Sequence, residues 1–266
     1  MQIGISTASL FKRYQTVDGL KRLKECGVQN VEVFFESFCE YNKKFGKKLA
    51  KIKGDVNVHS VHTLTTQFEP QLYTENSVAQ KDAFEILEGM LKGAKALGAK
   101  YYTFHGPARI KRTPFKINFD RVGEITKRVC DICSKYNVTL AYENVHWCYY
   151  NYVGFFSELK KRVPSLKGTL DIKQARQSEI DVYDLINEMA SDIVTVHLSD
   201  IDKDGKMCLP LAERGTIDFE KLFRALKDVG FDGTMLIEAY YGDYDSEDEL
   251  CESLEKLRAL ADKIFN

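Results

Sequence analysis

Short apolar runs rich in β-branched and aromatic residues alternate along the whole chain with longer segments of helical periodicity. The short runs predict eight strands, over residues 3–7, 30–35, 56–62, 101–105, 139–146, 168–172, 192–199 and 233–239. The periodic segments predict helices over residues 17–26, 41–53, 77–97, 119–136, 155–162, 182–189, 219–229 and 246–264. Eight units in 266 residues average about 33 residues each, which suits a repeated parallel strand–helix unit.

Two architectures fit this alternation: a closed (β/α)8 TIM barrel and an open, doubly wound sheet. The sequence has no hairpin signal, and its first predicted strand is not followed by a glycine-rich phosphate-binding motif. The longer connection before the helix at residues 77–97 contains Pro70 and is expected to be a loop. No linker or change in composition divides the chain. We therefore predict an α/β fold, a (β/α)8 TIM barrel that residues 1–266 form as a single domain.

Composition narrows the class of protein. With 44% hydrophobic and 29% charged residues the chain is typical of a globular protein, and its net charge of −1 argues against a dedicated nucleic-acid binder. No apolar run reaches the ~18–20 residues of a membrane span. Seven scattered cysteines and no secretory leader predict reduced thiols and a cytoplasmic location. Cys130 and Cys133 are neighbours on one predicted helix face, where packing explains them better than metal or redox chemistry.

Four consecutive predicted strands each end at or near a side chain that can bind a metal. These residues are Glu143, Asp171, His197 and Glu238, at intervals of 28, 26 and 41 residues. Each interval is roughly one strand–helix unit, so the four side chains are expected at equivalent positions on the active face of the barrel. Three carboxylates and one imidazole would need a cation between them. This donor set predicts one divalent ion, Mn²⁺ or Zn²⁺ first, with Mg²⁺ or Co²⁺ as alternatives.

Other polar residues near strand ends have less specific explanations. His62 and His105 end the third and fourth predicted strands, and Glu32 or Glu36 lies near the second. A single histidine after an apolar run is more often a hydrogen-bonded core residue than a ligand. His59 is expected on the opposite strand face from His62, in a structural role.

The ordered set of strand-end motifs resembles the xylose isomerase-like TIM barrels, a family that includes sugar and sugar phosphate isomerases and epimerases and the endonuclease IV branch. The motifs that carry the resemblance are SVHT, TFHGP, AYENVH, TLDIKQA, TVHLSD, ERGTIDF and LIEAYY. The resemblance implies that the four strand-end ligands form the shared metal site. It also implies that His62 and His105 match two histidines of the family. These histidines bind a further metal in nuclease members and contact substrate in sugar-handling members.

Two departures from the family pattern bear on function. Gln174 stands where nuclease members, and commonly ketose 3-epimerases, carry a histidine. The loop after the seventh strand also lacks the Asp-x-His pair of the nucleases. A three-metal nuclease centre is therefore not expected, and a close match to the 3-epimerases is weakened.

The function expected is that of a divalent-metal-dependent isomerase or epimerase acting on a sugar or sugar phosphate. Glu143 and Glu238 would lie on opposite sides of a cis-enediolate, one removing a proton and the other returning it. Substrate contacts are expected from the residues near this face, namely His62, His105, Gln174, Trp147, Lys203 and Arg214. Of these, Lys203 and Arg214 are candidate contacts for an anionic group, although solvated loop charges also explain them.

Three alternatives remain open from the sequence. A metal-dependent cyclitol or keto-sugar dehydratase would use the same site, with His105 as the acid for the departing hydroxyl. An endonuclease IV-like phosphodiester hydrolase is favoured by the two histidines and opposed by Gln174 and the balanced charge. A non-catalytic sugar-binding barrel is opposed by the intact ligand set. The oligomeric state, including a homo-oligomer, is also open.

Overall fold

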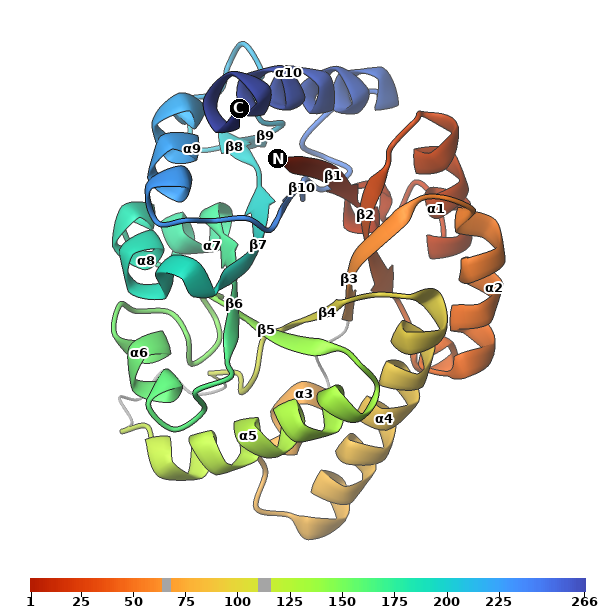
Figure 1. Ribbon diagram of the computed structural model, residues 1–266, viewed down its shortest axis with the longest axis vertical. Coiled ribbons are helices and arrows are strands. Elements are labelled where there is room, and N and C mark those ends of the chain that lie inside the picture. Colours follow the sequence, from red (N-terminus) through yellow and green to blue (C-terminus); the bar gives the residue numbers. More distant parts are fainter. Residues whose placement is uncertain (64–67, 110–115) are drawn as a thin grey trace.

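The computed structural model describes residues 1–63, 68–109 and 116–266, and these form a closed barrel of parallel strands (Figure 1). The order around the barrel is β1-β10-β7-β6-β5-β4-β3-β2, so β10 closes on β1. The barrel strands are β1 (Gln2–Ser6), β2 (Asn30–Phe35), β3 (Asn57–Thr63), β4 (Tyr101–Phe104), β5 (Thr139–Glu143), β6 (Lys167–Asp171), β7 (Ile193–Leu198) and β10 (Thr234–Ile237). The predicted (β/α)8 barrel is confirmed.

Helices form a ring around the barrel (Figure 1). They are α1 (Thr16–Glu25), α2 (Lys43–Lys53), α3 (Phe68–Leu72), α4 (Ser77–Leu97), α5 (Phe119–Lys135), α6 (Phe155–Lys160), α7 (Ile172–Gln177), α8 (Val182–Met189), α9 (Phe219–Asp228) and α10 (Glu247–Phe265). Their apolar faces explain the arrangement. In α4, for example, Leu87, Leu91 and Ala94 recur at helical spacing and are fully buried. The hydrophobic core joins these faces to the apolar side chains of the strands.

The barrel also contains a buried polar network centred on Glu32 of β2. This carboxylate is fully buried and accepts hydrogen bonds from Ser6, Ser60 and Thr103, at 3.2, 2.7 and 2.7 Å. The donors belong to β1, β3 and β4, so the Glu32 side chain crosses the inside of the barrel. Hydroxyl donors from several strands stabilise the carboxylate in its ionised form.

Two short helices lie where the sequence predicted a strand end and a loop. Residue 172 was expected in the sixth strand, but it begins α7, because Asp171 Oδ1 accepts a hydrogen bond from Gln174 N at 2.8 Å and caps the helix. The segment around Pro70 was expected as a loop and contains α3. Proline is compatible with the first turn of a helix, since that turn lacks carbonyl partners for its N–H groups.

The expectation of a chain without hairpins is wrong in the loop after β7. There β8 (Asp200–Ile201) and β9 (Met207–Cys208) pair antiparallel outside the barrel. The turn between them is closed by Asp202 N donating to Lys206 O at 2.8 Å, and Gly205 takes the positive φ of 85° that the turn requires. The turn contains Asp204-Gly205, a dipeptide typical of hairpin turns, but its flanking strands are only two residues long and give no strand pattern.

The face predicted for His59 is also wrong. The pairing of β2 with β3 shifts register between Val31 and Glu32, so His59 is an extra residue on β3. A bulge of this kind redirects the side chain. His59 Nε2 consequently lies 2.8 Å from Thr195 Oγ1 of β7, across the barrel. The side chain is buried and hydrogen-bonded, as expected of a structural residue.

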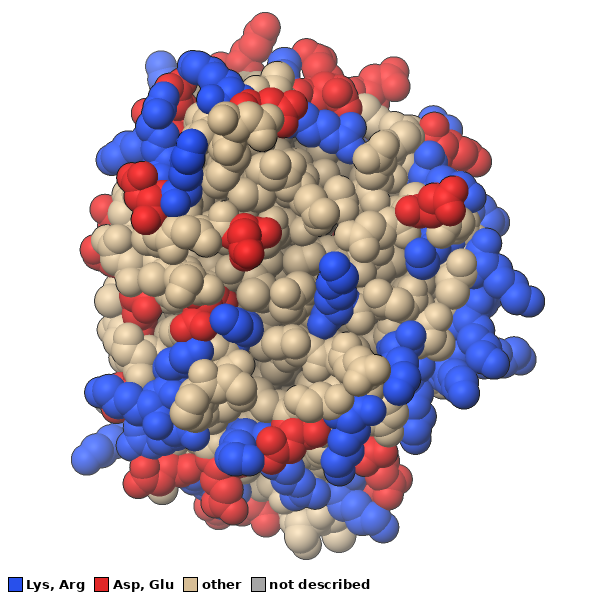
Figure 2. All heavy atoms as spheres, viewed as in Figure 1, with Lys and Arg blue, Asp and Glu red and all other residues tan. Residues whose placement is uncertain are grey.

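The outer surface carries a local cluster of positive charge. Lysine and arginine side chains gather along α2 in Figure 2, where Lys43, Lys44, Lys47, Lys48 and Lys51 line one face of the helix. This cluster lies on the helix ring and shares no residue with the strand ends.

The two cysteines of the CxxC motif are packed in the core, as expected. Cys130 and Cys133 are buried in α5, and burial raises the pKa of both thiols, that of Cys130 to about 12. Within the described ranges, no helix is both long enough and apolar enough to cross a membrane.

The burial of His59 predicts a pH dependence of stability. Burial lowers the pKa of His59 from its ordinary value of 6.5 to about 4, so the unfolded chain binds a proton that the folded chain excludes. The resulting stabilisation is present in full above pH 6.5 and is lost as the pH falls toward 4. At pH 5 the loss should be about 2 kcal/mol of unfolding free energy.

Urea unfolding of the wild type and of His59→Gln between pH 7.5 and pH 4.5 measures this contribution. The unfolding free energy of the wild type should fall more steeply than that of the variant. Equal slopes would show that His59 does not carry the effect.

Candidate metal centre

The four predicted ligands meet at the carboxyl ends of their strands. Glu143 ends β5, Asp171 ends β6, His197 lies next to the end of β7, and Glu238 directly follows β10. The ligand atoms of these residues all lie within 4.8 Å of one another, and each residue is at most 5% exposed. The register pairs His197 directly with Asp171, whereas Glu143 pairs with Thr169 and Glu238 follows two residues after Leu236, the partner of His197.

One nitrogen of His197 faces all three carboxylates. Nδ1 lies 2.6 Å from Glu238 Oε2, 3.2 Å from Glu143 Oε1 and 3.8 Å from Asp171 Oδ2. Glu143 Oε2 and Glu238 Oε2 are nevertheless buried without a hydrogen bond of good geometry. Buried carboxylate oxygens that converge without completing hydrogen bonds are a donor set for a cation, and O₃N ligation suits a divalent ion. The residues present therefore fit the metal that the sequence predicted.

The protonation equilibria reflect this crowding. Burial raises the pKa of Asp171. Burial acts in the same direction on Glu143, but the charge of His105 and contacts with three histidines bring its pKa well below the usual range. Burial opposes a charge on His197, yet the surrounding carboxylates, led by Glu238, raise its pKa. Positive charge is thus needed wherever these carboxylates remain ionised together.

Glu32 orients His197 from inside the barrel. His197 Nε2 lies 3.2 Å from Glu32 Oε1, although without a hydrogen bond of good geometry, and the other ring nitrogen, Nδ1, lies toward the three carboxylates. A carboxylate behind a ligating imidazole fixes the ring orientation and its tautomer. From the sequence, either Glu32 or Glu36 could lie near the site. The structure places Glu32 beside His197, whereas Glu36 accepts a hydrogen bond from Thr16 Oγ1 at 2.9 Å.

A two-bond clamp positions Asp171. Asn144 Nδ2 donates to the carbonyl oxygen of Asp171, and the backbone N–H of Asp171 donates to Asn144 Oδ1, both at 2.8 Å. The Oδ1 atom of Asp171 caps α7, which leaves Oδ2 for the site. The clamp and the cap together fix the end of β6 against the end of β5.

His62 and His105 form a second group with Glu143. Their Nε2 atoms lie 3.4 and 2.9 Å from Glu143 Oε2, and the three residues are close enough to hold an ion. Glu69 of α3, which sequence reasoning missed, is fully buried and accepts hydrogen bonds from the backbone N–H groups of His105 and Gly106 at 2.8 and 3.2 Å. It therefore positions the end of β4.

Lys173 is a second residue that sequence reasoning missed. It is the second residue of α7, and its side chain is only 4% exposed. Nζ lies 3.8 Å from Asp171 Oδ2 and 4.0 Å from Glu238 Oε1. Its sequence signal was a lysine two positions after a ligand, which is meaningful only once α7 is known to begin there.

The remaining residues predicted to contact substrate differ in how near they lie to the site. Trp147 packs its ring 5.4 Å from the ring of His105, beside the site. Gln174 Oε1 lies 2.6 Å from Nδ1 of the exposed His146. Arg214 is exposed and donates to the carbonyl oxygen of Asp243 at 3.0 Å, and Lys203 is exposed in the β8–β9 turn. No described interaction joins Lys203 or Arg214 to the four ligands.

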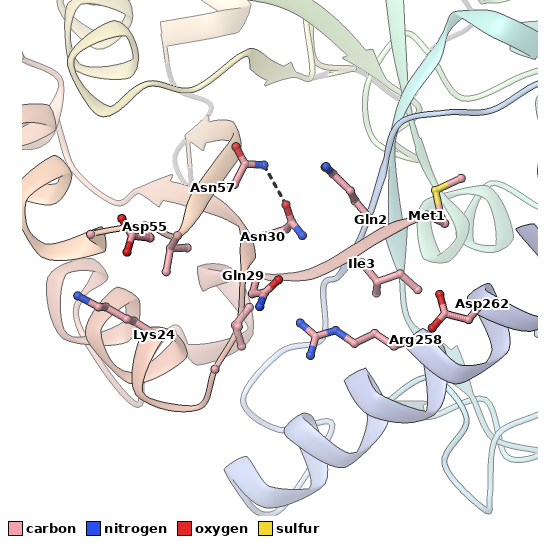
Figure 3. Close-up of a pocket in the computed structure, with 14 residues that line it drawn as sticks. Met1, Gln2, Ile3, Lys24, Gln29, Asn30, Asp55, Asn57, Arg258 and Asp262 are labelled. Carbon is pink, nitrogen blue, oxygen red and sulfur yellow. Dashed lines mark hydrogen bonds between the residues drawn. The ribbon is translucent and has the colours of Figure 1, made fainter. Parts of the chain in front are cut away.

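A groove of about 740 Å³ lies at the opposite end of the barrel (Figure 3). It is lined by residues such as Gln2, Asn30 and Asn57 at the amino ends of strands, and Asn57 Nδ2 donates to Asn30 Oδ1 at 2.9 Å. In TIM barrels this end supports stability, whereas chemistry is found at the carboxyl ends of the strands. The groove contains no residue of the metal cluster, so we do not assign it the function.

The fold and the cluster together define a TIM barrel with a buried candidate metal centre at the carboxyl ends of β5, β6, β7 and β10. The chain belongs to the family described as "Xylose isomerase-like TIM barrel", which matches residues 20–260. The family resemblance inferred from the strand-end motifs is confirmed. No curated protein matches the sequence significantly.

Several solved structures share the fold over their full length. A D-psicose 3-epimerase with D-tagatose from Clostridium cellulolyticum H10 has a TM-score of 0.79 at 15% identity and covers 99% of each chain. The IOLI protein with a binding zinc atom has a TM-score of 0.79 at 19% identity and covers 100% of each chain.

A third structure is the probable 3-DHS dehydratase AsbF from Bacillus anthracis. It has a TM-score of 0.74 at 14% identity and covers 97% of this chain and 99% of its own. Identities this low establish a common fold and leave the reaction to be argued from the residues of this chain.

The cluster predicts that metal affinity depends on His197. His197→Gln should weaken binding of Mn²⁺ or Zn²⁺ by at least about 100-fold. Loss of a residue that only hydrogen-bonds a metal ligand already lowers metal affinity by about 10- to 100-fold. His59→Gln is the matched control, since it replaces another buried histidine, one whose ring nitrogen lies against Thr195 of β7 and which is not among the four ligands.

Metal content and chelator competition on the folded proteins measure this effect. The wild type should hold about one ion per chain. Equal affinities in the two variants would remove His197 from the ligand set. Two ions per chain would indicate a second site, for which the group of His62, His105 and Glu143 is the candidate.

Proposed function

We propose that the protein is a divalent-metal-dependent isomerase or epimerase of a sugar or sugar phosphate, acting by proton transfer through a cis-enediolate. The observation that carries this proposal is the placement of two buried glutamates, Glu143 and Glu238, on either side of Asp171 and His197. Their strands, β5 and β10, are separated in the barrel by β6 and β7. Two carboxylates that approach one point from different strands can serve opposite faces of a planar intermediate.

Each residue has a defined task in this reaction. Asp171 and His197, together with the two glutamates, would hold the ion, and Asn144 and Glu32 lie against Asp171 and His197. Lewis-acid stabilisation of negative charge on the substrate oxygens is the chemistry that Mn²⁺ or Zn²⁺ supplies when bound. One glutamate removes the proton next to the substrate carbonyl and the other returns a proton. Return to the opposite face of the same carbon inverts it. Return to the neighbouring carbon, with the hydroxyl proton passing from one substrate oxygen to the other, interconverts aldose and ketose.

The residues proposed to contact substrate lie at different distances from the two glutamates. His62 and His105 lie against Glu143, where their imidazoles can hydrogen-bond substrate hydroxyls. Trp147 provides an apolar surface beside His105. Gln174, Lys203 and Arg214 retain their proposed contacts with the more distant part of the substrate.

A dehydratase is the second candidate. His105 Nε2 is 2.9 Å from Glu143 Oε2, so an acid for a departing hydroxyl lies beside a base. The shared fold of a probable dehydratase is compatible with this reaction. A nuclease is less well supported, since Gln174 stands where nuclease members carry a histidine and the lysine cluster of α2 lies on the outer ring, away from the site.

Proton exchange with solvent tests the proposal directly. The metal-loaded protein is incubated in D₂O with a panel of ketoses, their phosphates and inososes, and the products are examined by NMR. A substrate should gain deuterium on a carbon next to its carbonyl. Loss of water from a substrate would establish the dehydratase, and cleavage of abasic DNA without any labelled sugar would refute the isomerase.

The two glutamates are tested separately. Glu143→Gln and Glu238→Gln should each lower kcat by about 100- to 10,000-fold, because each loses a proton-transfer group. Glu36→Gln is the control. Glu36 lies just beyond β2 and accepts a hydrogen bond from Thr16. Metal content is measured in parallel, so that a lost ion is not mistaken for a lost base. Near-normal turnover in either variant would remove that glutamate from proton transfer.

A further inference from the structure

Two of the seven cysteines come from opposite ends of the sequence and lie in neighbouring helices. Cys26 is the C-terminal cap of α1, and Cys251 lies near the beginning of α10. Neither residue belongs to the metal cluster, and both are partly exposed. We propose that Cys26 and Cys251 form a reversible oxidation site, at which a low-molecular-weight disulfide converts the two thiols into a disulfide that joins α1 to α10.

The alignment of α1 with α10 brings the two cysteines together. Their preceding strands, β1 and β10, are parallel neighbours, so the two helices run in the same direction (Figure 1). Arg22 of α1 forms an ion pair with Glu247 of α10. Cys26 and Cys251 each follow four residues later, and residues four apart lie on the same face of a helix. The two thiols are therefore placed side by side, one helical turn beyond the ion pair.

The contact between the thiols affects the protonation of Cys251. Burial and a hydrogen bond with Cys26 raise the pKa of Cys251 to about 12, and the nearby carboxylates of Asp248 and Glu247 act in the same direction. Cys251 therefore keeps its proton and donates it toward the sulfur of Cys26. Because the thiolate is the nucleophile in thiol–disulfide exchange, we assign the first attack to Cys26.

The backbone at Cys26 can adjust to the geometry of a disulfide, which requires Cβ atoms about 3.8 Å apart. Cys26 ends α1, and Gly27 after it has a φ of 75° with no neighbouring atom where a side chain would point. A residue at the end of a helix can shift without breaking the hydrogen bonds of the preceding turns. Closure of the pair therefore leaves α1 intact.

Exposure distinguishes this pair from the other cysteines. Cys130 and Cys133 also lie near each other, in α5, but both are buried and out of reach of a dissolved disulfide. Cys39 is exposed, in the 3-10 helix Phe38–Glu40. It is expected to take up one small thiol without forming a crosslink, and it reports the reactivity of an ordinary surface cysteine.

The reaction consists of two exchange steps with glutathione disulfide as the co-reactant. The Cys26 thiolate attacks one sulfur of glutathione disulfide, forms a mixed disulfide and releases one glutathione. This step removes the charge on Cys26 that opposed ionisation of Cys251. Cys251 then loses its proton to solvent and attacks the Cys26 sulfur, which releases the second glutathione. The two protein thiols give up two electrons and two protons, and glutathione disulfide becomes two molecules of reduced glutathione.

Equilibration of the full chain in a glutathione buffer tests the inference. The wild type, Cys26→Ser, Cys251→Ser and Cys39→Ser are held in equal millimolar concentrations of oxidised and reduced glutathione. Free thiols are then alkylated, and the products are examined by intact mass and peptide mapping. Urea unfolding is measured on the oxidised and the reduced forms.

In the wild type, the form crosslinked between Cys26 and Cys251 should exceed the dithiol form at least about tenfold, because contact gives the two sulfurs a high effective concentration. Cys251→Ser should instead accumulate the mixed disulfide on Cys26, and Cys26→Ser should form no crosslink. Cys39→Ser is the control and should crosslink as the wild type does. The urea midpoint of the wild type should rise on oxidation, since the crosslink restricts the unfolded chain, and that shift should be absent from both variants of the pair.

The measurements on the wild type alone can overturn the inference. Glutathione on both cysteines without a crosslink would do so, as would a pair that stays reduced while Cys39 is modified. A crosslink between two chains, or between Cys39 and either cysteine, would assign the oxidation to a different pair. A lower urea midpoint in the crosslinked protein would show that the bond strains the helices, which would contradict the alignment of α1 with α10.

Discussion

Three carboxylates buried within a few ångströms of one another are the constraint on which the structure depends. Glu143, Asp171 and Glu238 come from the ends of β5, β6 and β10, which lie beside β7 or one strand away from it in the barrel, and they meet at the single imidazole of His197. Like charges in a buried site are costly unless cations compensate them. Histidines, Lys173 and the divalent ion that the donor set fits provide that compensation from different sides.

The polar interior of the barrel is arranged to orient these ligands. Glu32 joins three hydroxyl donors to His197, and Asn144 ties the end of β5 to the end of β6. Glu69 likewise positions the backbone at His105 by accepting a hydrogen bond from its N–H group. Buried polar networks rigidify a structure when their members are satisfied. The atoms that stay unsatisfied in this region mark where ion and substrate are expected to complete the network.

The sequence predicted the strand ends well because parallel strands in a barrel repeat at nearly constant spacing. Glu143, Asp171, His197 and Glu238 followed from that repeat. Residues whose role depends on a local irregularity were missed or misplaced. The bulge at His59 reversed its face, and the immediate start of α7 after Asp171 brought Lys173 to the site. Neither a register shift nor a one-residue strand-to-helix transition has a periodic signal.

The most direct test of the central claim is anomalous X-ray diffraction from crystals of the protein loaded with Mn²⁺ or Zn²⁺. We expect one strong anomalous peak within bonding distance of carboxylate oxygens of Glu143, Asp171 and Glu238 and of Nδ1 of His197, with Nε2 of His197 still facing Glu32. A peak elsewhere in the barrel, or none between the two glutamates, would contradict it.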